Sequence, residues 1–412
     1  MLYQPWTTIE RWETVDPKLK QLERAPFRLP HLDAALEKIP DGFGIFGLLG
    51  PRQVGKSTLL RLLAKQQLRK FAPDRVVIVE GDAFETWREL LDTLTAFLAS
   101  ERPAAILIDE ITAIREWHRS LKLLADRGSL EKVKVIYTGS SAMTLREGGE
   151  FFPGRRGTNA VTNIHLVPAS YRHVHKKMNL ETYFKVGGFP WAVNEYLRLG
   201  AIPDYVGEIY WSWLKGELLK RGKSEVLLRH ILHALVPRIT SGVSQNKLAR
   251  EMGITSNETA RQYLELLVLC FALNEVPWFD PVHKILSPRK NKKYYPIDPF
   301  LYHMFASSGL YANQWMAIDT RTETMGTVAE LVVCQELIQK HPDLGYWSGK
   351  REIDFVPPMI EVKYQNTVSP GEFAWFEKTV PKPQRLTVLT KVSQFNFGRV
   401  RAMPLEEWLL TS

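Results

Sequence analysis

The stretch GPRQVGKST, residues 50–58, combines glycines, one lysine and two hydroxyl side chains at a spacing that suits phosphate chemistry. It fits the pattern G-x-x-x-x-G-K-[ST], follows the apolar run GIFGLL and opens a helical pattern. Glycines let the backbone wrap around phosphates, and the first N–H groups of a helix add positive potential. The stretch therefore predicts a nucleotide-binding loop made of Gly50, Pro51, Arg52, Gln53, Val54, Gly55, Lys56, Ser57 and Thr58.

Two side chains of this loop have distinct expected roles. Lys56 would reach the terminal phosphates and contribute to catalysis, and the Ser57 hydroxyl would hold Mg²⁺. A glycine-rich turn without a ligand is the structural alternative, which the order of strand, loop and helix disfavours. ATP and Mg²⁺ are the predicted cofactors.

An acidic pair, Asp109 and Glu110, ends the apolar strand pattern AAILIDE. Asp109 would complete the magnesium shell, and Glu110 would orient or deprotonate the attacking water. The alternative is a helix start, where acidic residues favour the helix dipole. The position of the pair after a phosphate loop favours the catalytic interpretation.

Other polar residues follow later strand patterns. YTGSS offers Thr138 or Ser140 as a sensor of the terminal phosphate, although Ser and Thr also cap helices. FFPGRRGTN offers Arg155 or Arg156 as a cation that reaches the phosphate of a neighbouring subunit. A solvated basic loop explains these two arginines equally well.

The C-terminal stretch REIDFVPPMIEVKY carries a second set of chemically capable residues. Asp354 lies in one strand pattern, and Glu361 and Lys363 share one face of the next because alternate strand residues point the same way. Two carboxylates that hold a divalent cation, with a lysine beside the attacking water, are what a metal-dependent nuclease needs. Glu330, in the preceding helical pattern, is a fourth candidate.

This set predicts a second metal site of Glu330, Asp354 and Glu361 that takes Mg²⁺ or Mn²⁺. Asp354, Glu361 and Lys363 would be its catalytic residues. The alternative is that these charges form the solvated face of an ordinary strand pair.

The stretch GVSQNKLAREMGITSNETARQYLELLVLC, residues 242–270, joins two helical patterns by a short turn at Gly253 and predicts a helix-turn-helix. Such a unit presents its second helix to a DNA major groove, and the basic stretch after it would contact phosphates. Protein docking and a solvated basic turn are the alternatives. The expected DNA contacts are Asn257, Thr259, Arg261, Gln262, Lys284, Arg289, Lys290, Lys292 and Lys293.

Alternating elements must position these residues. Residues 44–170 alternate short apolar strands with amphipathic helices, which predicts a parallel sheet covered by helices on both faces. Residues 181–222 read as helical. Three helical patterns and a strand-like pair, FALNEVPWFD and KKYYPID, then occupy residues 223–300, and a helix and short strands end the chain.

The segments GPRQVGKSTLL, ILIDEITAIREWHRSLKLLADRG, IYTGSSA and GGFP resemble the AAA+-type ATPases of archaea and bacteria that carry a restriction-endonuclease-like C-terminal domain. The resemblance covers the chain from about residue 40. It implies an α/β P-loop NTPase core with a parallel sheet, a helical lid, a winged-helix domain and a C-terminal nuclease-like α/β domain, with homo-oligomer formation as an option. Family members often have Thr in place of Ser57, which leaves the hydroxyl unchanged.

The expected boundaries are residues 1–178 for the ATPase core, 179–222 for the lid, 223–312 for the winged helix and 318–412 for the nuclease-like domain. A chain of 412 residues favours several domains.

Composition limits the partners and the compartment. The net charge of +9 allows a polyanionic partner such as DNA. Cys270 and Cys334 lie in apolar helical runs and are expected to be buried rather than bonded to each other or to a metal. Because there is no signal-like N-terminus and no apolar run of membrane-spanning length, we expect a cytoplasmic protein without a membrane partner.

The favoured interpretation is a magnesium-dependent ATPase that binds DNA through a winged helix and carries a nuclease domain, acting in DNA processing, repair or defence. The alternative is a nucleotide-gated switch or scaffold whose inactive nuclease fold serves for binding. DNA-stimulated ATP hydrolysis would distinguish the two.

Overall fold

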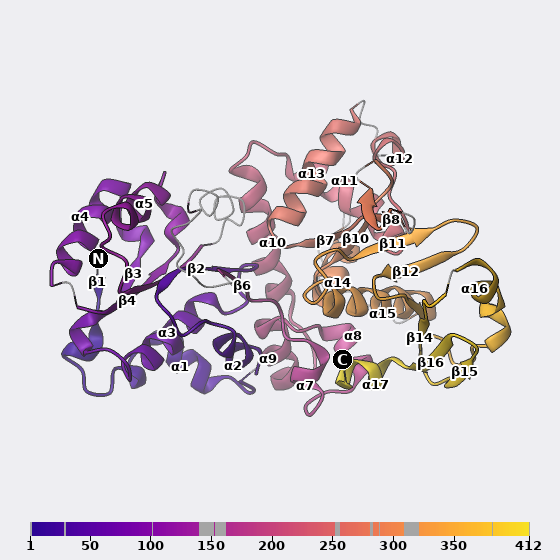
Figure 1. Ribbon diagram of the computed structural model, residues 1–412, viewed down its shortest axis with the longest axis horizontal. Helices are drawn as coiled ribbons and strands as arrows, with labels where there is room; N and C mark the ends of the chain where they lie inside the picture. The colour runs from indigo at the N-terminus through magenta and orange to yellow at the C-terminus, as the bar shows by residue number, and fades with distance from the viewer. Residues whose placement is uncertain are drawn as a thin grey trace. The chain divides into compact units, whose positions relative to one another are not determined.

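Two compact units make up the chain, Met1–Val167 and Pro168–Ser412 (Figure 1). The computed structural model describes residues 2–28, 30–100, 102–139, 152, 162–251, 256–280, 283–287, 289–308, 321–380 and 382–411. The finer division of the second unit into a lid, a winged helix and a nuclease-like domain stays a prediction.

A six-stranded sheet organises the first unit, with strand order β1-β3-β4-β5-β2-β6. Neighbours from β3 to β6 run parallel, and only β1 is antiparallel to its partner β3. The predicted α/β core with a parallel sheet is therefore confirmed. Its strands are β1 (Leu2–Tyr3), β2 (Gly44–Leu49), β3 (Val76–Glu80), β4 (Ala104–Asp109), β5 (Val133–Thr138) and β6 (Asn163–His165).

Apolar side chains on both faces of the central strands explain why the sheet is covered on both sides. In β3, Val76 and Ile78 join one core cluster, while Val77 and Val79, which point the other way, are also fully buried. Figure 1 shows α1 to α3 on one side of this sheet and α4 and α5 on the other. These helices are α1 (Pro17–Arg24), α2 (His31–Glu37), α3 (Lys56–Gln67), α4 (Trp87–Leu98) and α5 (His118–Asp126).

Helices open the second unit and continue between its strands. The described helices are α7 (Tyr171–Val174), α8 (Leu180–Val186), α9 (Pro190–Leu199), α10 (Asp204–Leu219), α11 (Glu225–Leu235), α12 (Gln245–Glu251), α13 (Asn257–Leu269), α14 (Pro299–Ser307), α15 (Thr322–Leu337), α16 (Ala374–Thr379) and α17 (Leu405–Thr411). Short 3₁₀ turns in the two units cover Pro5–Thr7, Trp12–Thr14, Pro73–Arg75, Gly81–Ala83, Ile111–Ala113, Val236–Arg238 and Pro370–Phe373.

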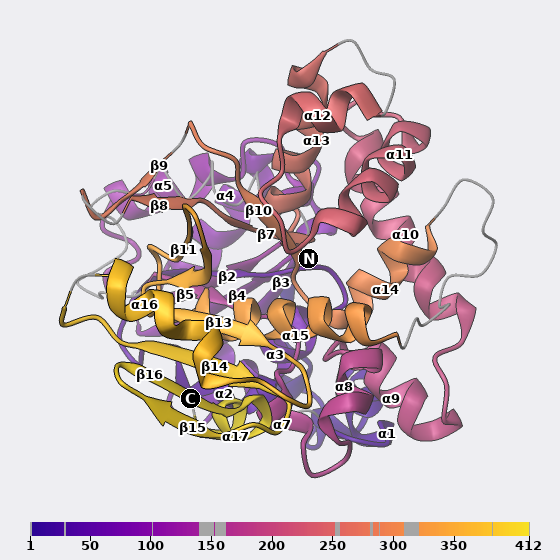
Figure 2. The same ribbon diagram turned by 90° about the vertical axis from the view of Figure 1, so that its right-hand side faces the viewer.

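Two sheets follow these helices. An antiparallel pair joins β7 (Leu273–Val276) to β10 (Lys293–Pro296). The second sheet has the order β15-β16-β14-β13-β12-β11-β8-β9, and Figure 2 shows the β8–β9 hairpin at one end of it. Its strands are β8 (Trp278–Asp280), β9 (Ile285–Ser287), β11 (Gly345–Ser348), β12 (Glu352–Val356), β13 (Ile360–Lys363), β14 (Leu386–Thr390), β15 (Phe395–Phe397) and β16 (Val400–Pro404).

One expected strand is divided in the structure. The sequence predicts a single strand over FALNEVPWFD, whereas the chain leaves its partner β10 after Val276 and forms β8 in the other sheet. Pro277 lies at the break, and proline has no N–H to continue a ladder. Its carbonyl instead accepts a hydrogen bond from the Tyr346 N–H of β11 at 2.9 Å.

The GGFP motif serves backbone packing at the end of α8. Gly187 has φ +69°, and a Cβ there would lie 2.0 Å from Asp298 Oδ1. The Asp298 carboxylate accepts hydrogen bonds from the N–H groups of Gly188 (2.8 Å) and Phe300 (2.9 Å). Burial raises the pKa of Asp298 to about 7, although these two donors lower it. The motif therefore joins α8 to the start of α14.

Gly188→Ala is expected to lower the free energy of unfolding by about 3 kcal/mol, because its Cβ would lie 1.7 Å from the carbonyl oxygen of Ala169. Gly216→Ala in α10 is the matched control, since no atom lies within 4 Å of its Cβ. A helical alanine there should raise stability by roughly 0.5–1 kcal/mol. Urea unfolding followed by circular dichroism measures both, and equal midpoints would contradict the packing argument.

Candidate functional site

The predicted phosphate loop connects β2 to α3 and needs its glycines. Gly50 has φ +151°, and a Cβ there would lie 2.1 Å from the carbonyl oxygen of Leu166. Gly55 has φ +105° in the left-handed region and precedes the first helical residue, Lys56. The first N–H groups of α3 thus open directly at the loop.

Lys56 is held inside the loop. Its ammonium donates to the carbonyl oxygens of Gly50 (2.9 Å) and Pro51 (2.7 Å), and the residue is 8% exposed. A phosphate oxygen is an acceptor of the same kind with a negative charge, so it fits this ammonium better than a neutral carbonyl does.

The remaining loop residues have different exposures. Val54 is fully buried, so that only its backbone can face a ligand. Arg52 and Thr58 are half-buried, and Gln53 is exposed with φ +61°.

Ser57 and Asp109 meet at the carboxyl edge of the parallel sheet. Ser57 lies on α3 and Asp109 ends β4, and the Ser57 Oγ donates to Asp109 Oδ1 at 3.1 Å. A hydroxyl and a carboxylate are oxygen ligands of the type that Mg²⁺ prefers. Ligands of open α/β sheets bind at this edge. The two residues therefore fit the magnesium ion that the sequence predicts.

Glu110 follows Asp109 in the left-handed conformation, with φ +53°. Its Oε1 accepts a hydrogen bond from the Thr112 hydroxyl at 2.8 Å. A Cβ on Gly81 would lie 2.3 Å from the Glu110 carbonyl oxygen, so the neighbouring turn approaches this backbone closely. Packing thus holds Glu110 beside the candidate magnesium ligand, and its role toward water stays a prediction.

Thr138 ends β5, the strand between β2 and β4. Its hydroxyl is buried and has no hydrogen-bond partner among the residues that the structure describes. An unsatisfied buried hydroxyl is unfavourable, so a ligand oxygen would stabilise it. Ser140, Arg155 and Arg156, the other expected contacts, lie outside the described residues.

Arg61 is a site residue that the sequence analysis missed. It lies on α3 with its side chain 6% exposed, and its Nη1 donates to Asp109 Oδ2 at 2.8 Å. The same guanidinium lies 3.4 Å from Glu80 Oε1 and 3.8 Å from Asp16 Oδ2. Each oxygen of Asp109 therefore has a partner, with Oδ1 bound by Ser57 and Oδ2 by Arg61.

The run LLRLL indicates a buried and paired arginine at position 61. Arg61 stands among leucines on a helix whose apolar residues are buried, which is unusual for arginine unless it is paired. Its acidic partners come from three other segments, so the pattern alone could not identify them.

A second cluster lies where the sequence predicts the nuclease-like metal site. Glu330 of α15 and Asp354 of β12 are both buried, and the ammonium of Lys293 lies between them. The Lys293 Nζ is 3.2 Å from Glu330 Oε1, 3.1 Å from Asp354 Oδ1 and 2.6 Å from Glu352 Oε1. Lys293 itself is fully buried.

Further hydrogen-bond donors bind the carboxylates of this cluster. Asp354 Oδ2 accepts the Val362 N–H at 2.9 Å, and Glu330 Oε1 accepts the Tyr295 hydroxyl at 2.5 Å. Glu361 Oε1 accepts the Lys363 ammonium at 2.5 Å, whereas its buried Oε2 has no described partner.

No group of three or more His, Cys, Asp or Glu side chains could hold a metal ion among the described residues. Asp354 and Glu361 do lie on the paired strands β12 and β13. The structure thus brings the expected residues together but adds Lys293, a cation that the sequence predicts to contact DNA.

Burial and charge set the protonation of this cluster. Burial and the nearby Asp354 carboxylate raise the pKa of Glu330, whereas the Lys293 ammonium and the Tyr295 hydroxyl lower it. Burial lowers the pKa of Lys293, but the carboxylates of Glu330, Asp354 and Glu352 outweigh it and raise that pKa well above its usual value. Lys293 is therefore an ammonium ion at neutral pH.

The burial of Lys293 corrects one expected DNA contact. A side chain with no exposed surface cannot reach a phosphate, so Lys293 leaves the basic set. Lys292 is half-buried and donates to Glu275 Oε1 at 2.6 Å. Lys284, Arg289 and Lys290 are exposed on the β8–β9 hairpin and after it.

The exposed face of α13 carries acids beside the expected DNA contacts. Arg261 pairs with Glu258 at 2.5 Å and Glu265 at 2.7 Å, so its charge is offset locally. The Asn257 amide donates to Asn246, Gln262 accepts from Lys223, and Thr259 is half-buried. Residues 252–255, which include the expected turn, lie outside the described chain.

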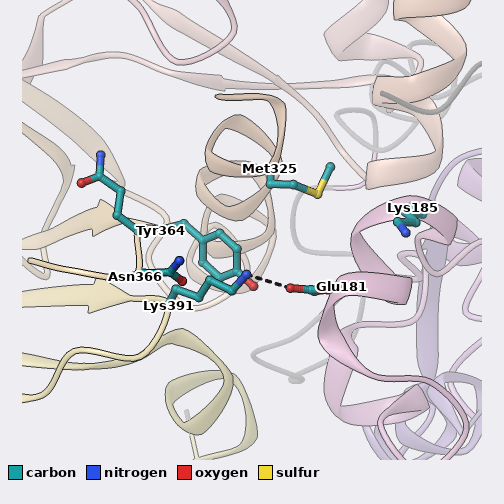
Figure 3. A pocket seen from close by; sticks show the side chains of 7 residues that line it. Glu181, Lys185, Met325, Tyr364, Asn366 and Lys391 are labelled. Carbon is teal, nitrogen blue, oxygen red and sulfur yellow. Dashed lines mark hydrogen bonds and ion pairs between the residues drawn. The ribbon is translucent and has the colours of Figure 1, made fainter. Parts of the chain in front are cut away.

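A pocket of about 180 Å³ lies at the carboxyl ends of β13 and β14 (Figure 3). Lys391 and Glu181 face each other across it, 2.9 Å apart. No residue assigned to nucleotide or nuclease chemistry lines it, so it belongs to neither candidate site. Its lining residues are Glu181, Lys185, Met325, Tyr364, Gln365, Asn366 and Lys391.

Two further expectations concern the cysteines and the membrane. Cys270 and Cys334 are buried, as the sequence predicts. Among the described helices, none has the length and apolar character that a membrane span requires.

Arg61→Met is expected to lower the free energy of unfolding by about 3 kcal/mol, because it leaves the buried Asp16 and the half-buried Asp109 without their cation. Lys65→Met, one turn further along α3, is the control. Lys65 and its partner Glu13 are 48% and 30% exposed and 3.6 Å apart, so its loss should cost less than about 1 kcal/mol. Urea midpoints that fall equally in both variants would refute the structural role of Arg61.

Two stretches of the chain match the models of known domain families. Residues 43–175 match the model of an AAA domain, and residues 177–311 match a domain of unknown function (DUF8612). No curated protein matches the chain.

Solved structures show low similarity over long stretches. The Walker-type ATPase PABY2304 of Pyrococcus abyssi is 17% identical over 66% of this chain and 92% of its own, with a TM-score of 0.44. The ORC1 protein of Aeropyrum pernix in complex with DNA is 10% identical over 82% and 98%, with a TM-score of 0.31. AMPPCP-bound DnaA from Aquifex aeolicus is 15% identical over 58% and 86%, with a TM-score of 0.30. Over residues 43–175, the chain is therefore similar to an AAA domain.

Proposed function

We propose that the first unit binds ATP together with Mg²⁺ and hydrolyses the terminal phosphate. The observation that carries this proposal is the meeting of Ser57 Oγ and Asp109 Oδ1 at 3.1 Å, beside a loop that holds Lys56. The AAA domain match over residues 43–175 supports the same reaction class.

The side chains of this site would each act on a different part of the reaction. Bound Mg²⁺ would neutralise charge on the phosphates. Lys56 would exchange its two carbonyl acceptors for phosphate oxygens, and Arg61 would keep Asp109 Oδ1 turned toward Ser57. Glu110 would orient the attacking water, and the buried Thr138 hydroxyl would gain a partner in the terminal phosphate.

DNA is the partner that we propose for the second unit. Lys284, Arg289 and Lys290 are exposed on or near one hairpin, and the chain carries a net charge of +9. The hairpin is a stronger candidate than α13, since Glu258 and Glu265 place negative charge on the exposed face of that helix. The winged-helix assignment and a homo-oligomer completed by Arg155 or Arg156 stay proposals from the sequence.

Metal-dependent DNA cleavage is the second candidate activity. The observation in its favour is that Asp354 and Glu361 lie on paired strands, with Lys363 two residues after Glu361. Cleavage would require a divalent cation beside Glu330 and Asp354, where the Lys293 ammonium lies. We therefore favour a binding role for this domain, which was the alternative that the sequence left open.

Lys56→Ala is expected to weaken ATP binding by roughly 10- to 100-fold, because it removes a charge-assisted hydrogen bond to phosphate. Glu110→Gln should leave the affinity nearly unchanged and lower kcat by about 100-fold or more. Isothermal titration and a phosphate-release assay measure the two effects. Lys65→Ala on the exposed face of α3 is the control and should change neither. Wild-type turnover in the Glu110 variant would remove that residue from the site.

Replacing Lys284, Arg289 and Lys290 together by alanine should weaken binding to duplexes of any sequence. The slope of log K against log salt should fall by about one unit for each phosphate that the variant no longer neutralises. The matched control replaces Lys378, Lys382 and Arg385, which are exposed elsewhere in the same unit. Fluorescence anisotropy at several salt concentrations gives the slopes. If both triple variants change the slope equally, net charge rather than the hairpin governs binding.

A further inference from the structure

We propose that the Lys293 ammonium is the resident cation of the carboxylate cluster of Glu330, Glu352 and Asp354, and that it occupies the place of a divalent metal ion. The cluster then connects β10 to α15 and β12 through ion pairs and is not a metal centre. This inference concerns the second candidate site and does not depend on ATP binding.

The Lys293 ammonium has as many hydrogen-bond donors as there are carboxylate oxygens around it. A lysine ammonium has three N–H donors, and three carboxylate oxygens lie 2.6–3.2 Å from Lys293 Nζ. These are ordinary hydrogen-bond distances for a charged pair. The donors of the ammonium are therefore used within the cluster, and the carboxylates of Glu330 and Asp354 turn toward it.

The strand that carries Lys293 is held in place by strand pairing and by burial. Lys293 pairs with Val276 of β7, and the next two residues of β10, Tyr294 and Tyr295, are buried. The Tyr295 hydroxyl donates to Glu330, so the same strand holds the cluster at a second point. The ammonium cannot leave without moving β10 or abandoning buried carboxylates, and an uncompensated buried charge is strongly unfavourable.

A divalent ion could not share this position. It would need the Glu330 and Asp354 oxygens that Lys293 already binds, at shorter distances than a hydrogen bond. It would also lie a few ångströms from a positive charge in a region of low dielectric constant, where like charges repel strongly. The cluster therefore binds no divalent ion while β10 is in place.

The cluster joins parts of the second unit that are distant in sequence. Lys293 is 37 residues from Glu330 and 61 from Asp354, and its ion pairs connect β10 to α15 and β12. Without the ammonium, the same oxygens would suit a small divalent cation such as Mn²⁺. The presence of the Lys293 ammonium thus determines whether these carboxylates form ion pairs or a metal site.

Mn²⁺ titration of nucleotide-free protein, followed by the loss of the free-ion EPR signal, tests the proposal. Wild type and Asp354→Asn should bind Mn²⁺ alike, because no wild-type site uses Asp354. Lys293→Met should gain a Mn²⁺ site, and the added change Asp354→Asn should abolish it. Lys292→Met is the control, since Lys292 pairs with Glu275 outside the cluster and its loss should create no site.

The wild-type comparison decides the matter even if Lys293→Met does not fold. Mn²⁺ binding by wild type that is lost in Asp354→Asn would overturn the proposal, as would Mn²⁺-dependent DNA cleavage that requires Asp354. A folded Lys293→Met protein that gains no site would also overturn it. If Lys293→Met folds, Mn²⁺ should raise its melting temperature and leave that of wild type unchanged.

Discussion

A carboxylate that leaves water must be met by a cation or by hydrogen-bond donors, and this constraint shapes both units of the protein. At Asp109 the cation is Arg61, which takes one oxygen and leaves the other to the Ser57 hydroxyl. At the C-terminal cluster the cation is Lys293, which lies among the carboxylates themselves. The first arrangement leaves an oxygen that a metal ion can share, whereas in the second the Lys293 ammonium binds one oxygen each of Glu330 and Asp354, the oxygens that a metal ion between them would need.

The parallel sheet that carries the first site could be predicted from apolar patterns in the sequence. Nearly continuous apolar runs such as AAILID can be buried on both faces only in a parallel sheet with helices on each side. Parallel strands end at one edge, so the loop after β2 and Asp109 at the end of β4 had to meet there. That Ser57 and Asp109 share this edge was therefore predictable from the motifs and the parallel sheet, whereas the strand order β4-β5-β2 comes from the structure.

The cations that complete the two sites were not predictable in the same way. Arg61 and Asp109 are 48 residues apart, and a sequence pattern shows that a charge is present without showing its partner. Lys293 belongs to a run of basic residues. Such runs are usually exposed to solvent, so the sequence does not show that Lys293 is buried. Only the pairing of β10 with β7 decides that Lys293 faces inward while its neighbour Lys292 stays half-buried.

We expect only one of the two carboxylate sites to take a divalent cation. Anomalous diffraction from crystals grown with Mn²⁺ and a non-hydrolysable ATP analogue measures the occupancy of both sites in one experiment. A manganese peak is expected between Ser57 and Asp109 beside the phosphates, and none within the Lys293 cluster. A peak between Glu330 and Asp354, or no peak beside Ser57, would contradict this expectation.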